Sequence, residues 1–235
     1  MPLWQDILIA RRAHAGGVWT PPAGCVLQLE AAISGAVPAE GTWEDFSGSG
    51  YDATLSTCIS VTSDGLTGRS SWPGGNATMG AAPLLNPGTG DFTACGWFRS
   101  ASLQQPILMS KQKLSPPYVG WTMKVSSGAV HGEVNPPNLK PTGGASVIDG
   151  TWHHLALVIE QAVSARVYRD GVLSGSVAMG SVFDLTTDAP AMLYARDGKG
   201  TAYAVSMDGV YAFSAAHTPA TLADIMANTG PNYGA

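Results

Sequence analysis

Residues 149–175 read DGTWHHLALVIEQAVSARVYRDGVLSG, and this stretch decides the fold. From Trp152 to Glu160, positions alternate between two faces with a period of two, which is typical of a β-strand. A second run, residues 165–169, follows it. Asp170-Gly171 then supplies the two-residue turn of a hairpin. The stretch therefore predicts antiparallel strands joined by tight turns.

This hairpin resembles the signature DGxWHHxAxV…xxYxDGxxxG of laminin-G-like domains in the concanavalin A-like lectin/glucanase superfamily. Further fragments resemble that family in the same order along the chain: a first core strand at Val26 to Leu29, a DFTxSxWFR-like strand at 91–99, a QxILSK-like strand at 106–111, a hairpin at 120–134 turned by Ser127-Gly128, and a closing strand at 207–213. The resemblance implies an all-β, two-sheet antiparallel jelly-roll β-sandwich. We expect one short helix near Thr218 to Met226, with Thr218 as its N-cap and Pro219 in its first turn.

Composition agrees with a single large β domain. The 235 residues include 29 Gly and 16 Pro, and only 12% are charged, about half the usual share. The net charge is −5 without any basic run, which argues against nucleic acid as a partner, since phosphates are neutralised by clustered Lys and Arg. No apolar run is long enough to cross a bilayer, so we expect no membrane partner.

The N-terminus predicts an arm outside the sandwich. Residues 1–24 end in a Gly- and Pro-rich joint, so we divide the chain into an arm and linker at 1–24 and a concanavalin A-like domain at 25–235. Trp4, Ile7 and Leu8 could form one apolar face that docks on a partner subunit or a second copy of the chain. The alternative is that the arm packs back on its own domain.

The cysteines bear on where the protein is made. Cys25, Cys58 and Cys95 are odd in number and widely spaced, which does not form a disulfide framework. Reduced thiols indicate assembly in a reducing compartment. Since no secretory signal is recognisable at the N-terminus, we expect a protein made in a host cytoplasm and built into a bacteriophage virion. A cytoplasmic module or a domain of a longer protein fits the same observations.

Catalysis is not expected. Glycoside hydrolysis normally uses two carboxylates across the scissile bond, and the strand around Glu133 has no second acid. Motifs for Ser nucleophiles, phosphate loops and zinc are also missing. His153 and His154 are adjacent on a strand and point to opposite faces, so they do not chelate one ion together. We expect structural polar partners for both.

Calcium is the one metal that the sequence supports. Asp45 and Asp52 lie in a Gly-rich loop that resembles the family's D-x-S-G-N-G loop. In similar domains a calcium often lies between this loop and the closing strand, where Asp208 matches the family's aspartate. Gly209 replaces the usual acid after it. The alternative is that Asp45 caps its own loop and Asp208 holds a turn.

Sugar binding needs an exposed aromatic ring near polar groups. Four aromatic residues in or beside predicted loops are the candidates: Trp72, Tyr118, Trp121 and Tyr203. The alternative is that these rings cover the core. Trp97 and Trp152 lie in the family's core strands and are expected to be packed.

Two functions follow from these observations. One is a non-enzymatic surface module of a bacteriophage virion, decorating a capsid or associated with a tail, which contacts other virion subunits through its arm and binds glycans. The other is a stand-alone carbohydrate-binding, lectin-like module of a bacterial protein.

Overall fold

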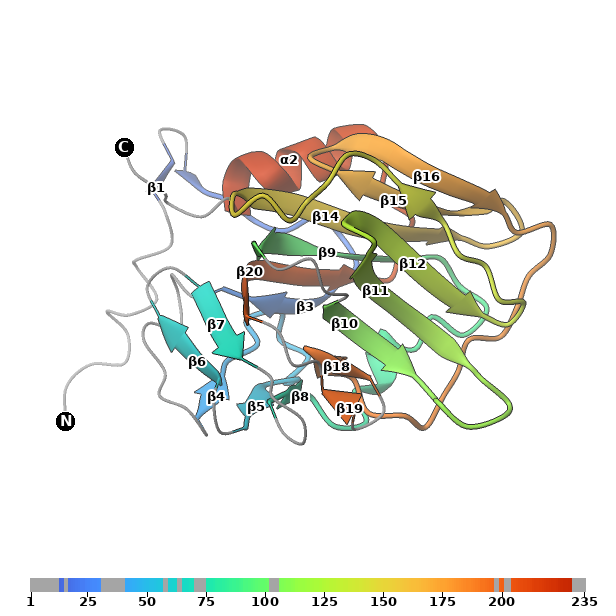
Figure 1. The fold of residues 1–235 in the computed structure, drawn as a ribbon, viewed down its shortest axis with the longest axis horizontal. Coiled ribbons are helices and arrows are strands. Elements are labelled where there is room, and N and C mark those ends of the chain that lie inside the picture. Colours follow the sequence, from blue (N-terminus) through green and yellow to red (C-terminus); the bar gives the residue numbers. More distant parts are fainter. Residues whose placement is uncertain are drawn as a thin grey trace.

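Two antiparallel sheets of eight strands each form the molecule, as predicted (Figure 1). The structure is a computed structural model, and it describes residues 13–14, 17–30, 41–56, 59–62, 65–69, 75–101, 106–196, 199–200 and 204–229. The two sheets pack face to face as a jelly-roll β-sandwich, and their apolar inner faces form one core between them.

The strands of the two sheets are ordered as follows. One sheet runs β16 (Val172–Ala178), β15 (Ser164–Arg169), β14 (Trp152–Glu160), β9 (Phe92–Arg99), β20 (Ala204–Phe213), β7 (Gly65–Arg69) and β6 (Ile59–Thr62), with β3 (Cys25–Leu29) paired to β20 beside β7. The other runs β13 (Thr142–Gly143), β12 (Ala129–Asn135), β11 (Gly120–Ser126), β10 (Ile107–Gln112), β17 (Met192–Leu193), β8 (Ala77–Thr78), β5 (Ala53–Leu55) and β4 (Thr42–Trp43). We refer to them as the β14 sheet and the β11 sheet.

The remaining elements are short. Two small pairs stand outside the main sheets, β1 (Ala13–His14) with β2 (Gly17–Val18) and β18 (Ala195–Arg196) with β19 (Lys199–Gly200). A 3-10 turn, η2 (Pro83–Leu85), precedes β9, and helix α2 (Pro219–Thr229) follows β20. None of the described helices is long and apolar enough to cross a membrane.

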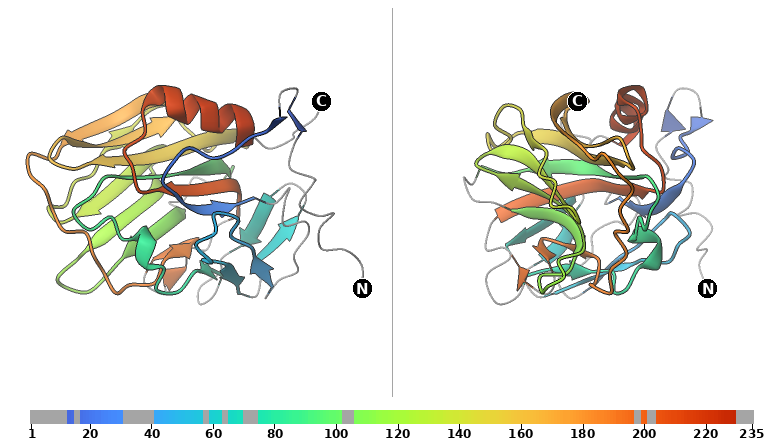
Figure 2. Two further views of the ribbon diagram at one scale, coloured as in Figure 1. Left: turned by 180° about the vertical axis from the view of Figure 1, so that it is seen from behind. Right: turned by 90° about the vertical axis from the view of Figure 1, so that its right-hand side faces the viewer.

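The period-two pattern of β14 separates two layers of packing. Leu155, Leu157 and Ile159 point into the core between the sheets, whereas Ala156 and Val158 point outward. The outward layer is buried because α2 lies along that side of the β14 sheet (Figures 1 and 2). This strand is therefore apolar on both faces, as is usual for a central strand covered on two sides.

Helix α2 begins where the sequence predicts. The Thr218 hydroxyl accepts a hydrogen bond from the Thr221 N–H at 3.2 Å, as an N-cap does. The helix ends at Thr229, three residues beyond the predicted end at Met226. Leu222 and Ile225 are its buried apolar anchors.

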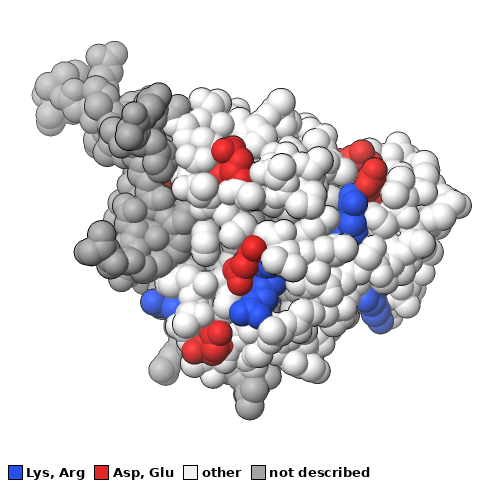
Figure 3. Space-filling view, turned by 90° about the horizontal axis from the view of Figure 1, so that it is seen from above, with Lys and Arg blue, Asp and Glu red and all other residues white. Residues whose placement is uncertain are grey.

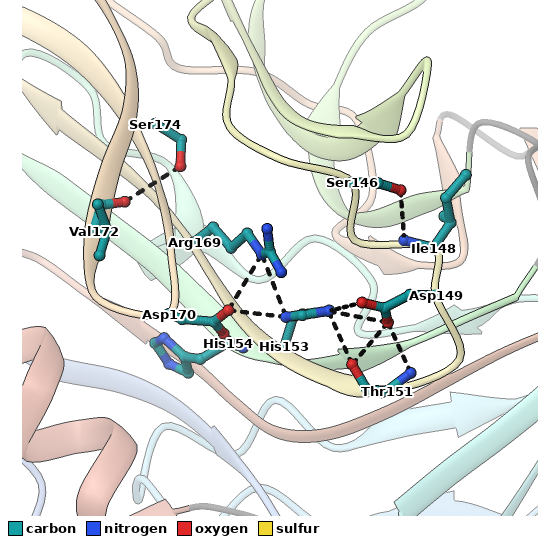
Figure 4. Close-up of polar contacts among 10 residues, drawn as sticks. All are labelled: Ser146, Ile148, Asp149, Thr151, His153, His154, Arg169, Asp170, Val172 and Ser174. Carbon is teal, nitrogen blue, oxygen red and sulfur yellow. Dashed lines mark hydrogen bonds and ion pairs between the residues drawn. The ribbon is translucent and has the colours of Figure 1, made fainter.

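A polar cluster explains why the signature stretch needs its particular residues (Figure 4). His153 lies between two turns of the chain. Its Nδ1 is 2.8 Å from Asp170 Oδ2, and its Nε2 is 3.1 Å from Asp149 Oδ1. Asp170 Oδ1 also accepts a hydrogen bond from the His154 N–H at 2.9 Å. One imidazole thus ties the start of β14 to the turn between β15 and β16.

The predicted hairpin turns have the required backbone. Asp170 and Gly171 have φ values of 51° and 76°, and Ser127 and Gly128 have 50° and 83°. A two-residue turn in which both central residues have positive φ has a backbone twist that matches the twist of the flanking strands. Asp tolerates this left-handed conformation better than most residues.

Glycines bring the edges of the two sheets together beside this turn. A Cβ at Gly143 would lie 2.0 Å from Ser174 O, and one at Gly175 would lie 2.5 Å from Thr142 O. Strand β13 of one sheet and β16 of the other can therefore approach backbone to backbone. Any side chain at either glycine would push the two edges apart.

Charged side chains are sparse on the face of the molecule that Figure 3 shows. Figure 3 shows isolated acidic and basic groups on that face and no continuous patch of one sign. This distribution follows from the low share of charged residues, and on this face it offers no footprint for a polyanion such as nucleic acid.

Candidate functional site

A polar cleft of about 410 Å³ opens on the outer side of the β11 sheet, where β10 and β12 end and β11 begins. In Figure 1 these strand ends lie toward the lower right. The lining combines side chains from the sheet, from β18 and from two loops: Gln112, Leu114, Tyr118, Glu133, Asn135, Asn138, Lys140 and Arg196.

The alternation of side chains along the strands decides which residues form the floor of this cleft. In β11, Trp121, Met123 and Val125 point into the core, so the residues between them face outward. Register pairs Thr122 with Glu133 and with Ser110, which brings polar side chains of three strands to the outer face. Strand β18 lies over the end of β10, because Ser110 Oγ donates to Ala195 O at 2.6 Å.

Two proline-rich loops form the walls. One joins β10 to β11 and contains Pro116 and Pro117 just before Tyr118, and the other follows β12 with Pro136 and Pro137. Pro fixes φ and so limits the conformations that a loop can adopt. Backbone hydrogen bonds close both loops at their bases, from Lys113 N to Val119 O and from Leu139 N to Val134 O, each at 2.9 Å. The cleft is therefore largely pre-formed, which lowers the entropy lost on binding.

Glu133 is the centre of the polar floor. Its carboxylate is paired with Lys124 at 2.5 Å and with Arg196. His131 Nε2 lies 3.6 Å from Glu133 Oε1. Arg196 Nη1 also donates to Gln112 Oε1 at 2.9 Å, and that same oxygen accepts from Thr122 Oγ1 at 3.0 Å. The network holds Arg196 and Gln112 in fixed positions at the wall and floor of the cleft.

The electrostatics of Glu133 argue against catalysis. Burial raises the pKa of this carboxyl, but the contact with His131, the hydrogen bond from Lys124 and the charges of Lys124 and Arg196 outweigh it and hold the pKa far below the usual range. A general acid in glycoside hydrolysis needs a raised pKa and a second carboxylate opposite it. Glu133 is the one carboxylate among the residues that line the cleft. Glu133 therefore lacks both the raised pKa and the opposing carboxylate that such a general acid uses.

Tyr118 is one of the aromatic residues that were predicted to contact a sugar. It lines the cleft beside the polar groups and is 55% exposed. A ring at the rim of a polar cleft can cover the apolar face of a sugar while the surrounding amides and charges bind its hydroxyls. Asn135 and Asn138 supply such amides, and Asn138 holds a left-handed backbone at φ 77° in the loop.

Trp121 was wrongly predicted as a sugar contact. Its side chain is fully buried, and its indole N–H donates to Leu85 O at 2.9 Å. The ring packs 4.8 Å from Phe92, centroid to centroid. The alternation of β11 turns Trp121 inward, so it belongs to the core. The two other predicted sugar contacts, Trp72 and Tyr203, lie outside the described residues.

Several residues of the cleft were missed by sequence reasoning. Gln112, Lys140 and Arg196 carry no motif of their own, and Glu133 was considered only as an acid without a partner. One signal was available: residues 115–118 and 135–138 each place a Pro-Pro pair beside a polar or aromatic residue at a strand end. Two rigid loops at neighbouring strand ends predict a shaped cleft.

The predicted calcium ligands have other partners. Asp45 accepts four hydrogen bonds, from Gln28 N, Ser47 N, Ser47 Oγ and Tyr51 N, at 2.9 to 3.0 Å. Four bonds fill the lone pairs of a carboxylate. The alternative prediction, that Asp45 caps its own loop, describes this arrangement.

The other two acids are similarly engaged. Asp52 accepts from Asp45 N at 2.8 Å, and Asp208 accepts from Gly209 N at 2.8 Å. Across the described ranges, no group of three or more His, Cys, Asp or Glu side chains is placed to hold a metal. These three acids therefore do not form a carboxylate cluster, and a calcium site completed by carbonyl oxygens stays a proposal. Gly209 adopts φ 50° within a bulge of β20, which explains a glycine where the family has an acid.

The predicted arm is described only in part. Trp4, Ile7 and Leu8 lie outside the described residues. Trp19, within the predicted arm, contacts the sandwich: its ring is 6.0 Å from that of Tyr211 in an edge-on arrangement, and its Nε1 donates to Asp224 at 3.2 Å. Trp19 therefore packs on its own domain, and docking through Trp4, Ile7 and Leu8 stays a prediction.

The adjacent histidines differ. His153 has the structural polar partners that were predicted. The prediction is wrong for His154, whose two ring nitrogens are buried without a hydrogen-bond partner among the described residues and whose ring lies 5.4 Å from that of Trp97. Burial lowers the pKa of His154 to about 4. The reason is strand alternation: His154 faces the apolar layer under α2, where few polar groups are available.

Comparison with known proteins agrees with the fold. The model of one family matches residues 73–223, and its description is concanavalin A-like lectin/glucanases superfamily. The chain belongs to this superfamily. No curated protein matches the sequence.

Several solved structures share the fold of this chain. The binding domain of Paraclostridial Mosquitocidal Protein 1 has a TM-score of 0.68 and 14% identity, over 86% of this chain and 51% of that chain. The receptor binding domain of botulinum neurotoxin D has a TM-score of 0.63 and 10% identity, over 86% of this chain and 52% of that one. A Trypanosoma rangeli sialidase has a TM-score of 0.61 and 17% identity, over 92% of this chain and 34% of that one.

These similarities establish the fold and not the activity. This chain spans about half the length of the two binding domains and about a third of the sialidase. Two of the three are binding domains by name, and the third is an enzyme.

Proposed function

We propose that this protein is a non-enzymatic carbohydrate-binding module, and that the cleft at the ends of β10, β11 and β12 is its glycan site. The observation that supports this is Tyr118, a ring 55% exposed at the rim of a cleft lined by two Asn, a Gln and charged groups. An aromatic platform with a few convergent polar groups is the usual composition of such sites.

The similar structures also support a binding function. Two of them are binding domains, one for a receptor, and the superfamily is named for its lectins and glucanases. The single carboxylate of the cleft, held ionised by Lys124 and Arg196, favours binding over hydrolysis.

Glycan-array screening followed by calorimetry tests the proposal. The full chain should bind a subset of polysaccharides, and Tyr118→Ala should lower affinity by at least about tenfold, since burying a large ring is worth roughly 1.5–3 kcal/mol. Tyr118→Phe should retain most of the affinity. Val163→Ala removes an equally exposed apolar side chain, 53% exposed, that does not line the cleft, and serves as the matched control. Equal binding by Tyr118→Ala and the unchanged chain would refute the site.

The virion setting is a second part of the proposal. We propose that the protein is a surface module of a bacteriophage particle, made in a host cytoplasm and attached to other virion subunits or to a second copy through its N-terminal arm. Cys25 and Cys95 support this setting, because neither forms a disulfide within the described part of the chain, and reduced thiols are typical of proteins assembled under reducing conditions. Immunogold electron microscopy of particles should place the protein on a capsid or tail. Label found only on bacterial cells would favour the stand-alone lectin-like module.

A further inference from the structure

The cleft differs in charge from the rest of the protein. The whole chain has a net charge of −5. In and directly beneath the cleft stand three cations, Lys124, Lys140 and Arg196, and one anion, Glu133. Three positive charges and one negative charge sum to +2. Lys113, at the start of the β10–β11 loop, adds nothing to this sum because it pairs with Asp188 at 3.3 Å.

Two of the three cations neutralise Glu133 and one does not. Lys124 and Arg196 are ion-paired to its carboxylate. Lys140 lines the cleft from the loop after β12, is exposed, and forms no ion pair within the described part of the chain. A cation without a partner at the wall of a partly enclosed cleft is placed to receive an anion from a ligand.

Arg196 adds a second donor toward the same space. Its Nη1 is occupied by Gln112 and Glu133. Its Nη2 forms no hydrogen bond within the described part of the chain, and its side chain remains 23% exposed. A carboxylate or sulfate in the cleft would find one guanidinium nitrogen and one ammonium, the donors that bind such groups best.

We infer that the cleft selects acidic glycans, in which a sugar ring on Tyr118 carries a carboxylate or a sulfate ester toward Lys140 and Arg196. This inference rests on the proposed function. The anion supplies selectivity among glycans, because a neutral sugar would leave the net charge of the cleft uncompensated. The ring contact supplies affinity for acidic and neutral sugars alike.

The test compares three probes on the full chain by calorimetry: a uronic acid oligosaccharide, a sulfated oligosaccharide and a neutral oligosaccharide of the same length. We expect an acidic probe to bind more tightly than the neutral one, and its advantage to shrink as salt screens the charges. If the uronic acid probe binds best, the anion is a carboxylate, and if the sulfated probe binds best, it is a sulfate ester.

Variants separate this inference from the proposed function. Lys140→Gln should weaken the preferred acidic probe about threefold to tenfold and leave the neutral probe unchanged. Lys140→Arg should keep the preference, and Lys113→Gln, which removes a paired lysine, should have no effect. If the neutral probe binds as tightly as the acidic ones and Lys140→Gln changes nothing, the inference is wrong while the glycan site stands. If no probe of any class binds, the glycan site itself is refuted.

Discussion

Replacing Asp170 with Ala tests the polar cluster that makes the signature stretch work. Asp170 has four roles in the structure: it accepts from the His154 N–H, it contacts His153 Nδ1, it pairs with Arg169 Nε at 3.2 Å, and it occupies a turn position at φ 51°. Ala loses the three side-chain contacts and adopts the turn conformation less readily. The hairpin between β15 and β16 and the start of β14 should loosen together.

The magnitude follows from each lost role. Leaving the His154 N–H without an acceptor costs roughly 1–3 kcal/mol, because that residue is buried. The contact with His153 adds little from charge, since the Asp170 side chain is 38% exposed and solvent screens it. The positive φ adds a smaller cost for a residue with a Cβ. The expected loss for Asp170→Ala is therefore on the order of 3 kcal/mol.

Asp170→Asn is the matched variant. Its amide oxygen can still accept from the His154 N–H, and Asn tolerates a left-handed turn. We expect a loss of about 1 kcal/mol, from the weaker contact with His153. The order of stability should be Asp, then Asn, then Ala.

Urea unfolding followed by circular dichroism measures both losses. In a thermal scan, about 3 kcal/mol corresponds to a fall of roughly 6–12 °C for a chain of this size. If Asp170→Ala unfolds at the midpoint of the unchanged protein, the cluster is a surface contact of no energetic weight. If Asn and Ala variants lose equally, charge rather than the His154 N–H determines the stability.

Three further predictions concern the buried histidine, the core tryptophan and the calcium proposal. Burial lowers the pKa of His154 to about 4, against 6.5 when unfolded, so the unfolded chain binds more protons between these values and stability falls as pH drops through 6.5 toward 4. We expect this residue to lower the free energy of unfolding by about 2 kcal/mol between pH 7 and pH 5. The urea midpoint of His154→Leu should vary much less over that range. If the variant has the same pH dependence as the unchanged protein, the lowered pKa of His154 is contradicted. Trp121→Phe leaves Leu85 O without its donor and opens a void, so the free energy of unfolding should drop by roughly 2–4 kcal/mol while the folded protein still binds glycan. Loss of binding at unchanged stability would instead mean that Trp121 contacts the sugar. If calcium binds near Asp208, a chelator should lower the melting temperature and Asp208→Asn should abolish that effect; identical melting curves with and without chelator would remove calcium from the proposal.

Local patterns account for most of what could be predicted. The alternation in residues 152–160, the Asp170-Gly171 and Ser127-Gly128 turns, and the Thr218-Pro219 helix start are set by neighbours within a few residues. Each depends on steric and hydrogen-bonding preferences that act along the chain. Together with the resemblance to laminin-G-like domains, they were enough to predict two antiparallel sheets and the helix after the last strand.

The cleft depended on contacts that no local pattern contains. Arg196 meets Glu133 and Gln112 across 63 and 84 residues of sequence, because β18 folds over the end of β10. Tyr118 and Trp121 are three residues apart, yet one is 55% exposed and the other is fully buried. Which of two nearby aromatic rings faces water depends on the position at which the strand begins, and a shift of one residue exchanges the faces. The sequence by itself determined the sandwich, since strands and turns are local; only the tertiary structure decided the site, since its charges and its ring come from segments that meet only once the sheets have paired.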